Sequence, residues 1–139
     1  MSRIKQGLNY LFAKPKTKKI EEIKKILTEE EYNIFINMDN YDKIHSMSVY
    51  ETVKKDKILN RDKKYLKLAL LHDCGKERVC LLIRMKKVLI GDKLLDMHPK
   101  LGYEKLKNID LKLANLILNH HNLDGNKKMK KFQKIDDKN

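Results

Sequence analysis

The sequence predicts an all-α protein, built as a single-domain helical bundle of about six to eight helices. Apolar residues recur with helical spacing along most of the chain, and the strict alternation that marks β-strands is nearly absent. Proline occurs only at Pro15 and Pro99, so long stretches are open to helix formation. With 139 residues the chain suffices for one hydrophobic core and is too short for two ordinary domains. We expect residues 1–40 to form helices that pack on or extend the core, and residues 41–139 to form the main helical unit.

The first three helices follow from periodicity and capping signals. The segment Thr17–Leu27 carries an apolar stripe flanked by lysine and glutamate. Thr28 opens a second helix, because Thr28 and Glu31 have the spacing of a capping box ahead of an apolar run. After the polar break Asp39-Asn40, a third amphipathic helix carries His45.

The second half of the chain begins with a helix that is apolar on nearly all sides. It runs from about Arg61 to Asp73, and such a segment is buried on most of its faces. We expect it to end at Cys74-Gly75, where Gly75 can take the left-handed conformation that closes a helix. The remaining predicted helices are Val79–Ile90, Leu101–Lys107 with Pro99 in its first turn, Leu111–His120 with Asp110 as N-cap, and roughly Lys128–Asp136.

The charge of the chain bears on its partners. A formal net charge of +13 attracts polyanions, so nucleic acid is one candidate partner. Lysine outnumbers arginine, the lysines are spread along the whole chain, and no basic motif interleaved with aromatic residues is present. We favour a solvated lysine-rich surface over a dedicated nucleic-acid face by about two to one.

Cysteine usage and hydropathy indicate the compartment. Cys74 and Cys80 match neither a CxxC motif nor a disulfide framework. No apolar run approaches the ~18 residues of a membrane span, and the N-terminal apolar stretch is too short for a signal peptide. We therefore expect a cytoplasmic protein with no membrane partner.

The pair His72-Asp73 stands at the end of the most apolar predicted helix. A buried carboxylate is costly unless it is paired or binds a metal, although an isolated His-Asp pair is structural more often, by about three to one. The other histidines are His45, His98, His120 and His121, and each lies in or at an end of a predicted helix. Imidazole and carboxylate donors together suit transition metals better than calcium or magnesium, and helical bundles build metal sites from facing helices.

These residues carry a family resemblance. The run Leu70-Leu71-His72-Asp73-Cys74-Gly75-Lys76 resembles the LLHDxGK signature of the HD superfamily of metal-dependent phosphohydrolases. The segment at His98-Pro99 resembles the HPxxGY segment of its HD-GYP-like branch, and His120-His121 resembles the double histidine of that branch. The closing helix supplies a final aspartate, for which Asp136 is preferred over its neighbour Asp137. The match runs from about Ile44 to Asp137 in the order of the family.

The resemblance implies a site with two divalent transition-metal ions, Fe or Mn first, with Ni, Co or Zn also compatible. His45, His72, Asp73 and Asp136 would hold one metal, and Asp73, His98, His120 and His121 the second. In that scheme Asp73 bridges the ions, a water between them attacks phosphorus, and Lys76 contacts the substrate phosphate. The substrate would be a phosphate ester or phosphoanhydride, such as a nucleotide or signalling nucleotide.

Two departures from the HD-GYP pattern narrow that expectation. Tyr41 stands where some members carry a glutamate for a third metal, which favours two metals. The Gly-Tyr-Pro segment after the double histidine is missing, so only the reaction class carries over. Two alternatives stay open: a basic module that binds nucleic acid, and a degenerate HD domain that acts as a sensor or scaffold.

Overall fold

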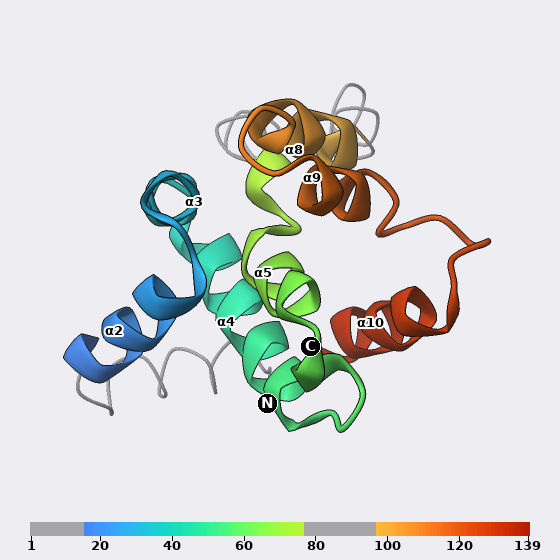
Figure 1. Cartoon of the computed structure of the whole chain (residues 1–139), viewed down its shortest axis with the longest axis horizontal. Helices are drawn as coiled ribbons and strands as arrows, with labels where there is room; N and C mark the ends of the chain where they lie inside the picture. Colours follow the sequence, from blue (N-terminus) through green and yellow to red (C-terminus); the bar gives the residue numbers. More distant parts are fainter. Residues whose placement is uncertain (1–15, 77–96) are drawn as a thin grey trace.

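A computed structural model describes residues 16–76 and 97–139 of the protein (Figure 1). Within these ranges it contains seven α-helices, two short 3-10 helices and no strand, which confirms the prediction of an all-α domain. No helix in this part of the chain is long and apolar enough to cross a membrane. The elements are α2 (Lys16–Ile26), α3 (Glu29–Ile36), α4 (Asn40–Lys55), η1 (Leu59–Arg61), α5 (Lys63–Leu71), η2 (Cys74–Lys76), α8 (His98–Leu106), α9 (Leu111–Leu118) and α10 (Lys127–Lys138).

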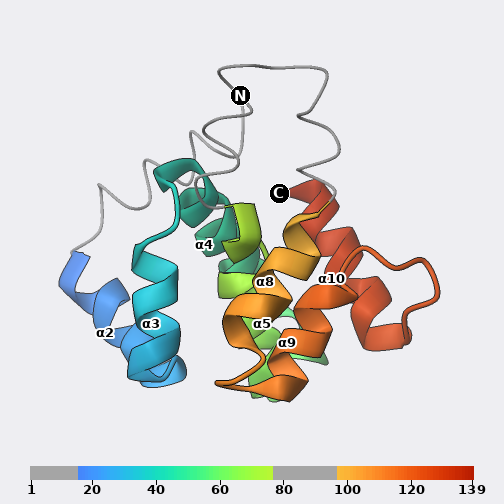
Figure 2. The ribbon, with the colours of Figure 1, turned by 90° about the horizontal axis from the view of Figure 1, so that it is seen from above.

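Helix α5 forms the centre of the molecule. Its last four residues, Leu68–Leu71, are fully buried, as the apolar sequence predicts. Helix α4 packs along one side of α5 and α9 on another, while α8 packs against α9 and η2 (Figures 1 and 2). Helices α2 and α3 lie at one end of the molecule and α10 at the other. Each buried leucine contributes about 1.5–3 kcal/mol, so α5 is the element around which the others are ordered.

Side-chain caps define where several helices begin. The capping box predicted at Thr28 is present, because the Glu31 amide donates to Thr28 Oγ1 at 3.2 Å and the Thr28 amide to Glu31 Oε1 at 2.9 Å. The predicted cap Asp110 accepts from the Leu113 amide at 3.1 Å. Two caps that we did not predict begin α5 and α10, namely Asp62 and Asn126. Three of these caps, Asp62, Asp110 and Asn126, set the first turns of helices that lead to the site described below.

Polar contacts attach the N-terminal helices to the central ones. Lys67 on α5 donates to the Glu31 carboxylate at 2.8 Å, and both side chains are buried. Glu22 on α2 accepts from the Tyr50 hydroxyl at 2.5 Å and from Lys54 at 2.7 Å. Helices α2 and α3 therefore pack on α4 and α5, while the proposed division of the chain at residue 40 stays a prediction.

Several predicted boundaries were wrong. The helix expected to reach Asp73 ends at Leu71, and the one expected to reach His120 ends at Leu118. Pro99 does lie in the first turn of α8, but that helix begins at His98 rather than at Leu101. Gly75 does not have a positive φ, so it does not close a helix in the left-handed conformation. The predicted helix Val79–Ile90 lies outside the described residues.

Candidate metal centre

The predicted ligands converge from five elements that are far apart in the sequence. His45 lies within α4, and His72 and Asp73 follow the end of α5. His98 is the first residue of α8, whereas Asp136 lies in the last turn of α10. The two residues after α9 that complete the set are His120 and His121. The structure therefore brings all seven predicted ligands together.

Six of these residues form two groups of three. In the first group, Asp136 Oδ1 lies 2.8 Å from His45 Nε2 and 3.1 Å from His72 Nε2. In the second group, His98 Nε2 lies 3.2 Å from His120 Nε2 and 3.3 Å from His121 Nε2. Within each group the donor atoms all lie within 4.8 Å of one another. Each group can thus surround one metal ion.

Asp73 lies between the two groups and presents one carboxylate oxygen to each. Its Oδ1 is 3.2 Å from His98 Nε2. Its Oδ2 is 3.3 Å from His72 Nε2 and 3.7 Å from His45 Nε2. This placement is the one required of a carboxylate that bridges two cations.

Backbone contacts orient two of the imidazoles at the helix ends. His72 Nδ1 lies 3.0 Å from the carbonyl oxygen of Ala69, and His120 Nδ1 lies 2.5 Å from that of Ile117. A carbonyl oxygen only accepts, so in both rings Nδ1 carries a proton. In His120, whose lowered pKa keeps the ring neutral, this tautomer leaves the Nε2 lone pair directed into the site. The same contacts occupy carbonyls at the ends of α5 and α9.

The second group is electrostatically suited to a cation. Burial and the neighbouring imidazoles His72 and His121 lower the pKa of His120 to about 3. Burial, together with the charge of His98, also lowers the pKa of His121. His120 is therefore neutral at physiological pH, and its nitrogen is a lone-pair donor facing another ring nitrogen at 3.2 Å. The Nε2 lone pair of His120 is therefore available to a metal ion held by this group.

Asp136 in the first group and Asp73 between the groups carry the negative charge of the site. Burial alone would raise the pKa of Asp73 and of Asp136, but the charge of His72 outweighs it and holds both well below their usual range. Conversely, burial would lower the pKa of His72, while Asp73 and Asp136 hold it well above its usual range. Two carboxylates are thus ionised in a buried position, which is favourable when they face cations.

Lys76 lies next to the bridge position. Its Nζ is 3.4 Å from Asp73 Oδ2 at the edge of the site. Burial would lower the pKa of Lys76, but the charges of Asp73 and Asp42 raise it. Asp42 was missed by the sequence analysis, which considered only its exposed neighbour Tyr41. The spacing of Asp42 and His45, three residues apart on α4, was a signal that both share one helix face.

Comparison with known families agrees with this arrangement. The family model described as HD domain matches residues 42–136, which is more than half of the chain. The protein therefore belongs to the HD-domain family, whose members are generally metal-dependent hydrolases that bind divalent metals. Searches of curated proteins and of solved structures gave no match. The matched segment contains all seven predicted ligands and Lys76.

Proposed function

We propose that this protein hydrolyses a phosphate ester or phosphoanhydride, of a nucleotide or a signalling nucleotide, with two divalent transition-metal ions. The observation that carries the proposal is the placement of Asp73 between two groups of three donors. The mixed set of imidazoles and carboxylates suits Fe or Mn first, with Ni, Co or Zn as alternatives, and disfavours calcium and magnesium.

The two groups of donors support one assignment of the ligands. His45, His72 and Asp136 would hold one ion, the three remaining histidines the other, and Asp73 would contact both. When bound, the ions would supply Lewis acidity, which acidifies water and stabilises charge on the transferring phosphoryl oxygens.

Residues of the chain orient the imidazole ligands and place a positive charge beside the metal centre. The contacts of His72 Nδ1 and His120 Nδ1 hold two rings in fixed orientations, which reduces the rearrangement needed on binding. Lys76 Nζ stands beside Asp73 and is partly exposed, so it can contact a phosphate oxygen of the substrate as a point charge. We assign Lys76 the binding of the substrate phosphate and Asp73 the central catalytic position.

The test uses the purified full-length protein, loaded with Mn or Fe and assayed against a panel of mononucleotides and cyclic dinucleotides. We expect hydrolysis of at least one substrate, and its loss in His72→Ala and in Asp73→Ala. Lys76→Met should retain metal but lose about 10²-fold or more in rate, by analogy with removal of one transition-state contact. Activity that survives both His72→Ala and Asp73→Ala would refute the proposal.

Helix α10 offers a matched pair of variants for the ligand assignment. Asp136 faces His45 and His72, whereas Asp137 is exposed one residue further on. Asp136→Asn should lower the metal content measured by elemental analysis, and Asp137→Asn should leave it unchanged. Equal metal content in the two variants would remove Asp136 from the ligand set.

One observation supports a second candidate function. The net charge of +13 favours binding of a polyanion, so a module that binds nucleic acid remains the alternative proposal. It predicts tight RNA or DNA binding with a steep salt dependence that does not change when metal is removed. Metal content separates the hydrolase from a scaffold, since close to two ions per chain favours the former and close to none the latter.

A further inference from the structure

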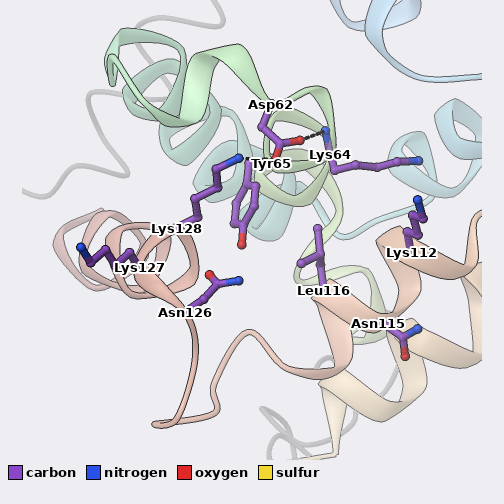
Figure 3. Close-up of a pocket in the computed structure, with 9 residues that line it drawn as sticks. All are labelled: Asp62, Lys64, Tyr65, Lys112, Asn115, Leu116, Asn126, Lys127 and Lys128. Atoms are coloured by element: carbon purple, nitrogen blue, oxygen red, sulfur yellow. Dashed lines mark hydrogen bonds and ion pairs between the residues drawn. The ribbon is translucent and has the colours of Figure 1, made fainter.

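The double histidine lies in a turn within the segment that connects α9 to α10. In Figure 3 this connection ends at Asn126, the residue just before α10. The Asn122 amide donates to the carbonyl oxygen of Asn119 at 3.0 Å, so His120 and His121 are the two central residues of a four-residue turn. Two ligands of the second group therefore depend on the conformation of one turn.

Gln133 on α10 contacts the backbone of this turn. Its Nε2 donates to the carbonyl oxygen of His120 at 3.2 Å and to that of Asn122 at 2.6 Å. An amide oxygen in that position would face two acceptors, so the two carbonyls require the nitrogen there. The carboxamide of Gln133 thus binds the backbone on both sides of His121.

The bond to the His120 carbonyl acts on the peptide group that determines the shape of the turn. That carbonyl belongs to the peptide between His120 and His121, whose orientation distinguishes a type I turn from a type II turn. Rotation of this peptide would change the angle between the two imidazoles. Their Nε2 atoms lie 3.2 and 3.3 Å from His98 Nε2, so such a rotation would separate the donors of the second group.

Helix α10 is itself held in place beside α4. Asp136, one turn after Gln133, lies 2.8 Å from His45 Nε2. One turn further along, Asn139 Oδ1 accepts from the Ser48 hydroxyl of α4 at 2.7 Å. Residues three positions apart share a helix face, so the same face of α10 carries a ligand of the first group and a hydrogen-bond donor to the backbone of the second.

We propose that Gln133 is a positioning residue of the metal centre, which holds His120 and His121 in the conformation that the second ion requires. The inference rests on the two-metal site proposed above and adds a residue that acts through the backbone of two ligands. His121 is exposed whereas His120 is fully buried, so packing restrains His121 less and the turn has the larger part in placing it. Replacement of a residue that orients metal ligands typically costs about 10- to 100-fold in metal affinity.

Two substitutions on α10 form a matched pair for the test. Gln133→Met keeps the length of the side chain and removes both donated hydrogen bonds. Lys134→Met introduces the same side chain at the neighbouring exposed position and serves as the control. Both are made in the full-length protein, which a chelator frees of metal before each measurement, and neither replaces a metal ligand.

Amide hydrogen exchange of the metal-free protein tests the contact itself. In Gln133→Met the amides of residues 119–122 should exchange about tenfold faster than in the wild type, because the turn loses two hydrogen bonds to α10. Lys134→Met should exchange as the wild type does. Equal exchange rates in Gln133→Met and in the wild type would overturn the proposal, whether or not the protein is a hydrolase.

Titration with Zn, followed by the nitrogen NMR resonances of the imidazoles, tests the effect on the ligands. These resonances report the first and the second group of donors separately. In Gln133→Met the imidazoles of the second group should respond only at Zn concentrations about 10- to 100-fold higher than in the wild type. Those of the first group should respond within about twofold of the wild type, because their own contacts are unchanged.

The pattern of losses separates positioning from a general effect on stability. Equal weakening of both groups would show that Gln133 stabilises α10 as a whole and would overturn the proposal. The same conclusion would follow if Lys134→Met and Gln133→Met weakened Zn binding equally. Wild-type imidazoles that do not respond to Zn would instead refute the proposed two-metal site, and hydrogen exchange alone would then decide whether Gln133 holds the turn.

Discussion

Gly75→Ala should dislocate the candidate metal centre without touching any ligand. Gly75 lies in η2, two residues after Asp73, and packs against the start of α8. A Cβ atom added there would lie 2.0 Å from the carbonyl oxygen of His98 and 2.6 Å from the amide nitrogen of Gly102. Both obstacles are backbone atoms, so no side chain can rotate away.

The size of the effect follows from that overlap. A Cβ contact below 3.0 Å is essentially never found, so the distance to the His98 carbonyl must grow from 2.0 Å by about 1 Å. Overpacking of this kind costs about 1–3 kcal/mol, and we expect the upper end because two backbone segments must separate. The shift falls between Asp73 and His98, which are 3.2 Å apart, and a displacement of about 1 Å can cost about 100-fold in rate.

Three measurements on one variant check this reasoning. Urea denaturation should show the loss of stability, elemental analysis a lower metal content, and the hydrolysis assay a rate reduced about 100-fold or more. Gly125→Ala is the matched control, because its added Cβ would approach the Met129 side chain, at 2.8 Å from Cγ, and would meet backbone only at an ordinary contact distance of 3.7 Å from the Asn122 carbonyl oxygen. If Gly75→Ala matched Gly125→Ala in stability and metal content, the close approach of η2 and α8 would not be what positions Asp73.

Two further predictions concern the contacts that hold α2 and α3. Lys67→Met leaves the Glu31 carboxylate buried without its partner, so the free energy of unfolding measured by urea denaturation should fall by about 3–5 kcal/mol. Adding Glu31→Gln should recover part of that loss. If the effects of the two substitutions simply added, the two side chains would not interact as a buried pair. For Glu22, burial would raise the pKa, but the hydrogen bonds from Lys54 and Tyr50 outweigh it and lower the pKa. A carboxyl group with a depressed pKa stabilises the folded state at pH values above its unfolded pKa of about 4.3. This stabilisation is lost as the pH falls through the pKa of the folded state. The difference in free energy of unfolding between wild type and Glu22→Gln, about 1–3 kcal/mol at pH 7, should therefore shrink below pH 4. A difference that stays constant with pH would contradict a lowered pKa for Glu22.

Helix starts could be predicted where the signal is local. The capping box of Thr28 and Glu31 and the cap Asp110 depend on residues three positions apart, and both were found from the sequence. The caps Asp62 and Asn126 were missed, although both are good N-cap residue types. In both cases lysines follow, instead of the acidic residues that usually mark a first turn.

The ends of helices were harder to predict from the sequence than their starts, because tertiary contacts determine where a helix ends. Apolar periodicity continues to Asp73 and to His120, and it suggested helices of that length. In the structure the rings of His72 and His120 each turn back to a carbonyl three residues earlier, which the helix end leaves available. The position of Gly75 depends on His98, which is 23 residues further along the chain. No local pattern records such a contact.

The choice between Asp136 and Asp137 could have been made from the sequence with more certainty. Met129 and Phe132 are the buried residues of α10, and they are three positions apart. Residues spaced by three or four positions share a helix face, so a carboxylate four positions after Phe132 continues the same face. Asp136 meets that condition, whereas Asp137 is rotated by about 100° toward solvent. The apolar residues that attach α10 to the core thus also direct the half-buried Asp136 carboxylate toward His45 and His72, which is why we expect only Asp136→Asn to release metal.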